Sequence, residues 1–262
     1  MSSDPTPGPS RLRRIDAALL LASVAGLTLR LSLTDGIYRY LRPSMRPWLT
    51  ASGVFIAGLA LATVVTAQRE RRQGSHRAST RASLVGWFLV VPLVVAVSTD
   101  PGALGAFAVR QQADARYAAP DDFHLDTYLA SHTTGGQTPV LQFKQFLAAA
   151  GGSSDDRQLL ASTTVRLTGF VVHQEDDAPG AFTLARLMVG CCAGDASALM
   201  VTVRGYDGEP LPDDEWIEVT GRFDQRLTSQ QPQDRIAGPT PVLAMASLRH
   251  VDEPREPYEY PF

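Results

Sequence analysis

The sequence has few of the residues that build disulfide frameworks and common active sites. It contains 2 cysteines in 262 residues, too few for a disulfide framework or a zinc site with four cysteine ligands. Its glycines and prolines have no repeating period, which excludes a collagen-like chain. It has no GxSxG motif, no glycine-rich phosphate loop and no HExxH motif, and its five histidines show no metal-type spacing. We therefore expect the protein not to be an enzyme.

Positive charge is also scarce in the second part of the chain. The formal net charge is −3, but residues 1–110 carry +8 and residues 111–262 carry −11. This asymmetry predicts a membrane domain at 1–110, a linker with two short helices at 111–162, and a β domain with a proline-rich tail at 163–262. A part with a charge of −11 is a poor electrostatic match for nucleic acid, so we expect no nucleic-acid partner.

Three apolar stretches interrupt the basic part, at about residues 15–33, 48–67 and 82–98. Trp48–Ala67 runs for 20 residues without a charge, enough to cross a lipid bilayer as a helix. The first stretch also resembles a signal peptide, but no Ala-x-Ala cleavage site follows it, so we interpret it as an uncleaved span. Buried helices of a soluble protein are the alternative, which three such stretches in succession disfavour.

The distribution of arginines predicts the orientation of these spans. Eight arginines lie in the N-terminal segment and in the loop after the second stretch, and five lie on the opposite side. Because positive loops stay in the cytoplasm, we expect a cytoplasmic N-terminus and an extracytoplasmic acidic domain at the plasma membrane.

The second stretch carries small residues at helical spacing. Gly53 and Ala57, and then Gly58 and Ala62, are pairs four residues apart that allow two helices to approach closely. This face is suited either to another membrane protein or to the chain's own helices.

The acidic part is predicted to begin with short helices at Asp121–His132 and Val140–Ala150. Strand-like runs separated by turn signals follow, and Gly169 and Gly221 interrupt two of them, which indicates bulges or bends. The five runs are Thr164–His173, Ala181–Val189, Leu199–Arg204, Trp216–Phe223 and Pro241–Val251. We predict a mainly-β, five-stranded barrel of the OB type, with an open β-sandwich as the alternative.

The segment RLMVGCCAGDA, Arg186–Ala196, contains both cysteines, Cys191 and Cys192, with Asp195 close behind. Adjacent side chains on a strand point to opposite faces, so both thiols can reach one ligand only if the backbone turns. The glycines on either side of the pair permit such a turn. We take Arg186 together with these three residues as the candidate ligand-binding motif.

Three chemistries are open to the cysteines. The two thiolates and Asp195, with an imidazole such as His173 or His250, could bind zinc or another divalent metal. The thiols could instead form a strained vicinal disulfide, or one thiol could be buried as a small apolar group while the other is incidental. Asp195 has a second interpretation as a turn residue that accepts backbone N–H bonds.

Several segments resemble one known family. They are YLRPSMRPWL (Tyr40–Leu49), VVPLVVAVSTDPGALGAFAVR (Val90–Arg110), LTGFVV (Leu167–Val172), RLMVGCCAGDA, WIEVTGRF and the terminal EPREPYEYP. With these, the chain resembles the YcgQ-type bacterial membrane proteins, whose C-terminal half is a domain of unknown function. The resemblance implies a role beside a multi-span permease. Family members often carry a histidine-rich stretch between the second and third spans, and here that loop holds only His76.

The sequence thus leads to two hypotheses. In the first, the chain is an accessory subunit of a multi-span membrane permease, anchored in the lipid bilayer, whose extracytoplasmic domain binds substrate or gates the partner. In the second, it is a membrane-anchored metal-binding or thiol-sensing protein centred on Cys191 and Cys192.

Overall fold

The structure is a computed structural model that describes residues 11–72, 95, 102–111, 123–132, 136–174, 177–229 and 240–261. The chain divides into two compact units. The helical unit comprises residues 1–37 and 43–102, and the β unit comprises residues 38–42 and 103–262. The third apolar stretch, at 82–98, lies outside the described residues except for Val95.

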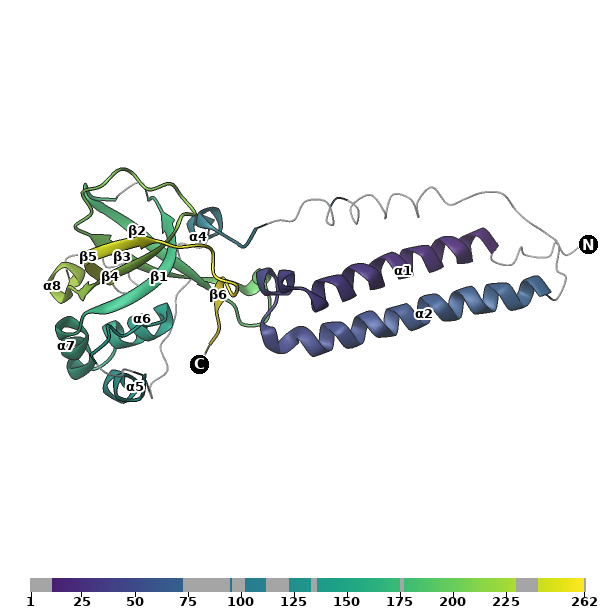
Figure 1. Ribbon diagram of the computed structural model, residues 1–262, viewed down its shortest axis with the longest axis horizontal. Helices are drawn as coiled ribbons and strands as arrows, with labels where there is room; N and C mark the ends of the chain where they lie inside the picture. Colours follow the sequence, from purple (N-terminus) through teal and green to yellow (C-terminus); the bar gives the residue numbers. More distant parts are fainter. Residues whose placement is uncertain are drawn as a thin grey trace, which may run out of the picture. The chain divides into compact units, whose positions relative to one another are not determined.

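Two long helices, α1 (Arg11–Leu33) and α2 (Arg46–Arg72), pack side by side in the helical unit (Figure 1). Short 3-10 helices, η1 (Asp35–Arg39) and η2 (Pro43–Met45), lie between them in the sequence. The segment Pro43–Thr66 is 24 residues long and apolar enough to cross a membrane, whereas the apolar part of α1 is shorter. Both apolar stretches described by the structure are therefore helical, as predicted.

Contacts between α1 and α2 are close. A Cβ atom at Gly53 would lie 2.9 Å from the Leu29 side chain, so the missing side chain is what lets the helices approach. Arg46 Nε donates to the carbonyl of Ser32 over 2.7 Å near the connected ends of the helices. The sides of the pair that face away carry large exposed apolar residues: Leu19, Val24, Leu33, Trp48, Val54, Phe55, Leu59, Leu61, Val64 and Val65.

The β unit contains a five-stranded mixed β-barrel. Its strands are β1 (Val165–Val172), β2 (Ala181–Met188), β3 (Ser197–Arg204), β4 (Trp216–Phe223) and β5 (Val242–His250). All five predicted strands are confirmed, each end within two residues. Alternating burial along β4 shows why: Ile217, Val219 and Gly221 face the interior and their neighbours face outward.

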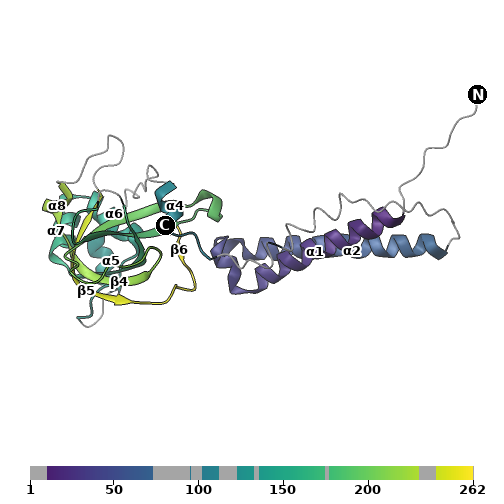
Figure 2. The same ribbon diagram turned by 90° about the horizontal axis from the view of Figure 1, so that it is seen from above.

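Strand β1 closes the barrel because it pairs with two partners. It pairs with β4 along most of its length and with β2 at Phe170–Val172, both antiparallel. The remaining pairs are β2–β3, the parallel pair β3–β5, and β4–β5. The ring order is therefore β1–β2–β3–β5–β4, which excludes the open β-sandwich. Figure 2 shows the curved strands of this barrel, with β4 and β5 labelled.

Both strand glycines lie where the backbone is crowded or irregular. A Cβ atom on Gly169 would come within 2.5 Å of the Ala185 carbonyl and 2.9 Å of the Phe143 ring. At Gly221 the pairing of β4 with β5 shifts register, which confirms the predicted bulge.

Short helices surround the barrel. Helices α5 (Leu125–His132) and α6 (Phe143–Gly151) are confirmed, with later starts than predicted. From α6, Phe143 and Phe146 are fully buried in the main core with residues of the strands. Three further helices were not expected from the sequence: α4 (Ala106–Gln111), α7 (Ser154–Ser162) and α8 (Gln225–Ser229).

A short sixth strand was not expected either. β6 (Tyr258–Glu259) pairs in parallel with Leu187 and Met188 of β2. It forms within the proline-rich tail, between Pro257 and Pro261. The tail therefore packs back on the barrel, and Tyr258 is 3% exposed.

We expect Gly169→Ala to destabilise the β unit by about 1–3 kcal/mol, because the added methyl group meets a backbone carbonyl and a buried ring. That corresponds to a loss of roughly 2–4 °C in the unfolding midpoint per kcal/mol for a unit of this size. Thermal unfolding of the full chain, followed by near-ultraviolet circular dichroism, measures the effect. Gly151→Ala is the matched control, since a Cβ atom there has nothing within 4 Å. Equal midpoints for both variants would contradict the crowding at Gly169.

Candidate functional site

The two cysteines lie in the loop between β2 and β3. The backbone leaves β2 after Met188, and a short 3-10 turn, η3 (Ala193–Asp195), reverses it before β3 begins. Both thiols are free, with Cys191 exposed and Cys192 partly exposed. The loop thus supplies the turn that adjacent cysteines need if they are to share one ligand.

The carboxylate of Asp195 holds this cysteine loop in shape. Its Oδ1 accepts a hydrogen bond from the Gly190 amide over 3.0 Å, and its Oδ2 accepts one from the Cys191 amide over 2.7 Å. Burial opposes ionisation, but the hydrogen bonds from the Cys191 thiol and from these amides lower the pKa of Asp195 overall. The role of Asp195 as a turn residue that accepts N–H bonds is therefore confirmed.

Three ligand-type atoms meet at this loop. One sulfur atom from each of Cys191 and Cys192 and one carboxylate oxygen of Asp195 all lie within 4.8 Å of one another. Hydrogen bonds to Asp195 and Cys192 raise the pKa of the Cys191 thiol to about 11, so this thiol is protonated at neutral pH. The cluster is a compact set of two sulfur donors and one oxygen donor close to solvent.

Arg186, the first residue of the motif, has other partners. Its guanidinium lies 5.0 Å from the centre of the Trp216 ring, donates to the Thr168 carbonyl over 3.1 Å and donates to the Glu256 carbonyl over 2.8 Å. These contacts join β1, β2 and the C-terminal tail. Arg186 therefore has a structural role and does not belong to the cluster of Cys191, Cys192 and Asp195.

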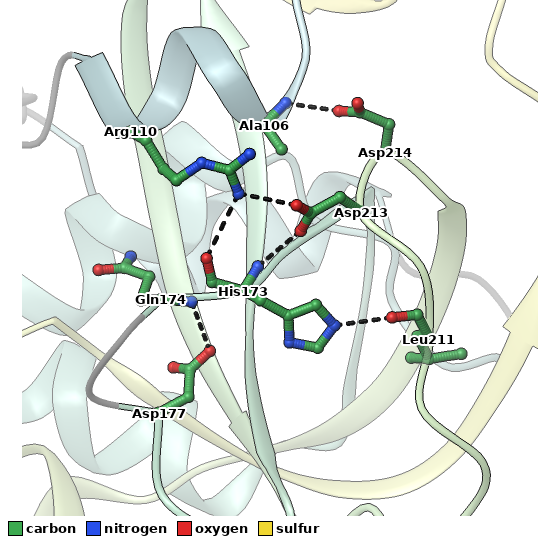
Figure 3. A network of polar contacts seen from close by, with 8 residues as sticks. All are labelled: Ala106, Arg110, His173, Gln174, Asp177, Leu211, Asp213 and Asp214. Carbon is green, nitrogen blue, oxygen red and sulfur yellow. Dashed lines mark hydrogen bonds and ion pairs between the residues drawn. The ribbon is translucent and has the colours of Figure 1, made fainter.

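His173 is placed in a different polar network (Figure 3). Its ring Nε2 lies 2.7 Å from the Leu211 carbonyl, and its amide donates to Asp213 over 2.8 Å. The imidazole of His250 lies 2.5 Å from Glu215. Among the described residues, no histidine joins the cluster of Cys191, Cys192 and Asp195.

The network in Figure 3 attaches α4 to the barrel. Asp213 accepts from Arg110 of α4 over 2.8 Å, and Asp214 accepts from the Ala106 amide over 2.5 Å. Burial opposes ionisation of Asp213, but the bonds from the His173 amide and from Arg110 lower its pKa overall. Asp214 has a positive φ of 67°, a conformation that aspartate tolerates better than most residues. The network holds α4 against the strands of the β unit.

The segment Tyr38–Arg42 is a part of the site that the sequence did not reveal. It connects α1 to α2 in the chain but belongs to the β unit, and we call it the connector. The Ala193 amide donates to the Tyr40 carbonyl over 2.7 Å, and the Arg42 amide donates to the Cys191 carbonyl over 3.2 Å. Leu41 and Cys192 face each other as an antiparallel β-bridge. The connector thus forms a strand-like edge on the cysteine loop.

Tyr258 of β6 ties the connector to a second segment. Its hydroxyl donates to the Arg39 carbonyl over 3.0 Å and accepts from the Leu104 amide over 2.9 Å. Burial raises the pKa of Tyr258, so the hydroxyl keeps its proton at neutral pH. One side chain therefore joins the connector, the residues that precede α4 and the C-terminal tail.

The next residue, Glu259, caps α6. Its two carboxylate oxygens accept from the amides of Phe143 and Lys144 over 2.6 and 3.0 Å, at the positive end of the helix. Burial raises the pKa of Glu259 and outweighs the opposing effect of these bonds, and Arg186 and Lys144 lie near enough to oppose it as well. Glu259 is 5% exposed, so the cap is part of the folded core.

We expect Asp195→Asn to make the Cys191 thiol more reactive. Without the carboxylate, the pKa of the thiol falls from about 11 toward its ordinary value, and the thiolate fraction at pH 8 rises. A lower pKa also weakens the nucleophile, and the contribution of Cys192 to the raised pKa is already absent in a Cys192→Ser background, so the net gain in alkylation rate there is several-fold, up to about tenfold. Iodoacetamide labelling in a Cys192→Ser background, where Cys191 is the remaining cysteine, measures the rate. Asp252→Asn, an exposed carboxylate, is the control, and equal rates in the two variants would contradict the role of Asp195.

Comparison with known proteins bears on the β unit. No curated protein matches the chain. Residues 140–261 match the model of one family, described as the DUF1980 C-terminal domain, and this range includes the barrel, the cysteine loop and β6. The resemblance of the whole chain to YcgQ-type proteins stays a prediction. The C-terminal part of the chain, residues 140–261, is therefore similar to the DUF1980 C-terminal domain.

Proposed function

We propose that the protein is an accessory subunit of a multi-span membrane permease, with an extracytoplasmic β domain that binds the transported species or gates the partner. The observation that carries this proposal is the connector. This part of the segment that joins α1 to α2 is hydrogen-bonded to the loop of the β unit that gathers three ligand-type side chains. A change in the cysteine loop would therefore act directly on the chain between the two helices.

The exposed surface of the helices supports a place in the bilayer. Phe55 is 67% exposed and Leu61 is 65% exposed, both within the segment Pro43–Thr66. Exposing such side chains to water is unfavourable, whereas lipid or partner helices accept them. The first and third apolar stretches complete the proposed three spans, and the arginine distribution supports a cytoplasmic N-terminus.

The small residues of α2 form two pairs with different surroundings. Gly53 is buried against Leu29 of α1, and Ala57 is partly buried. Gly58 and Ala62 are exposed, and a Cβ atom on Gly58 would have nothing within 4 Å. This second pair leaves room for a helix of the partner to approach closely.

The barrel is consistent with a binding module of the OB type. Its ring order, with β3 and β5 parallel and a long segment between β4 and β5, supports that assignment. Oligonucleotide binding would need a basic groove, and the strongly negative charge of residues 111–262 disfavours it. We therefore place ligand recognition at the cysteine loop rather than on a nucleic-acid surface.

Photo-crosslinking in native membranes tests the partner. A benzoylphenylalanine in place of Phe55 or Leu61 should form an adduct with a multi-span membrane protein, identified by mass spectrometry. The same reagent in place of Phe107 is the matched control, because Phe107 is 72% exposed but lies outside α1 and α2. Adducts with lipid or with a second copy of the chain alone would contradict the proposed permease partner.

Labelling of the natural cysteines tests the orientation. A membrane-impermeant maleimide should modify Cys191 in intact cells without permeabilisation, because this thiol is exposed and the β domain is proposed to lie outside. A Cys191→Ser, Cys192→Ser, His76→Cys variant is the control, since residue 76 lies in the arginine-rich loop expected in the cytoplasm. Labelling of position 76 and protection of Cys191 in intact cells would reverse the proposed topology.

A further inference from the structure

We propose that Cys191, Cys192 and Asp195 form a three-ligand site for a soft or borderline divalent metal ion such as zinc, and that binding there is transmitted to the connector. The inference deepens the proposed function because it names a ligand class for the β domain. The existence of the site does not depend on a permease partner.

The donor set selects the class of ligand. Two sulfur donors with one carboxylate oxygen suit zinc and softer ions, whereas magnesium and calcium prefer sites made of oxygen atoms. The oxygen of Asp195 remains available even though the carboxylate accepts two amide bonds, because a carboxylate offers about four lone-pair positions. The same residue can therefore shape the loop and hold the ion.

The geometry is close to that of a metal site. Two sulfur ligands at about 2.3 Å from a tetrahedral ion lie about 3.8 Å apart. The three ligand atoms lie within 4.8 Å of one another, so a contraction of about 1 Å or less would bring them to this spacing. Rotation of two exposed or partly exposed thiol side chains can supply such a movement, and Gly194 adds no side chain beside the Cys192 sulfur.

Three protein ligands leave one position of a tetrahedral ion open. Structural zinc sites are usually closed by four protein ligands, whereas sites that exchange or activate a ligand keep one position free. Cys191 and Asp195 are both exposed, so the open position faces solvent. This arrangement suits an ion that is received and passed on, and disfavours one that only stabilises the fold.

The loop and the connector share backbone bonds on both sides of Cys192. The carbonyl of Cys191 accepts from Arg42, and the amide of Ala193 donates to Tyr40. An ion that fixes both thiols must restrict the backbone between these two bonds. The connector then becomes more rigid as well, because its own amide and carbonyl are paired with that backbone.

Metal titration of the reduced full chain in nanodiscs tests the site. We expect one cobalt or zinc ion per chain, and for cobalt a thiolate charge-transfer band in the near ultraviolet. Cys191→Ser and Cys192→Ser should each weaken binding at least about a hundredfold and remove part of the band, more than the roughly 10- to 100-fold loss expected for an outer partner. Asp195→Asn should weaken binding at least about tenfold, and Asp252→Asn should leave it unchanged.

Circular dichroism of each variant verifies that it is folded. Absence of stoichiometric binding in the folded wild type, or equal binding in the Asp195→Asn and Asp252→Asn variants, would overturn the site.

Hydrogen exchange of the same samples tests the coupling. We expect zinc to slow exchange in peptides that contain Arg42 and Ala193, by at least about threefold, and to leave α5 unchanged. If zinc binds but exchange in the connector peptide does not change, the coupling is overturned, whereas the metal site itself is still supported. Because neither measurement involves the permease, a negative crosslinking result with a positive metal titration would reject the partner alone.

Discussion

The β unit depends on the way β1 divides its length between two neighbours. It pairs with β2 only at Phe170–Val172 and with β4 along most of its length, and Gly169 allows the close passage of the backbones where β1 leaves β2. This division closes the barrel at one end of β2 and leaves the other end, at Leu187 and Met188, without β1. That free edge is occupied by β6. A barrel closed along the whole of β1 would have no place for the C-terminal strand.

The position of β6 determines what the tail can hold together. Parallel pairing with β2 brings the Tyr258 hydroxyl to the connector and the Glu259 carboxylate to the start of α6. The contact between Tyr258 and Arg39 spans 219 residues of sequence, so the connector gains this bond only after the C-terminus has been synthesised. The buried carboxylate of Glu259 would be costly alone, and the two helix amides with the neighbouring cations offset part of that cost. The C-terminal tail is therefore an integral part of the folded β unit.

Local patterns determined which features could be predicted from the sequence. The five strands were predictable because alternating burial and turn residues are encoded within each strand, and the bulge at Gly221 follows from the glycine itself. Helix α7 had a readable signal, since Ser153 accepts from the Asp156 amide as an N-cap. β6 and the connector gave no such signal, because their pairing partners lie far away in the chain. The compact arrangement of the cysteines depended on the turn η3, which the flanking glycines permitted but did not require.

The same long-range pairing determines which segment responds when the cysteine loop changes shape. A loop between two antiparallel strands is normally free to change shape without affecting other parts of a protein, because its ends are held by the strands. Here the cysteine loop has an additional neighbour, and the bonds to that neighbour are made by backbone groups that every residue except proline provides. The neighbour is the connector, which lies within the segment between two apolar helices. Any event that reshapes the loop around Cys191 and Cys192 must therefore either break these bonds or move the connector.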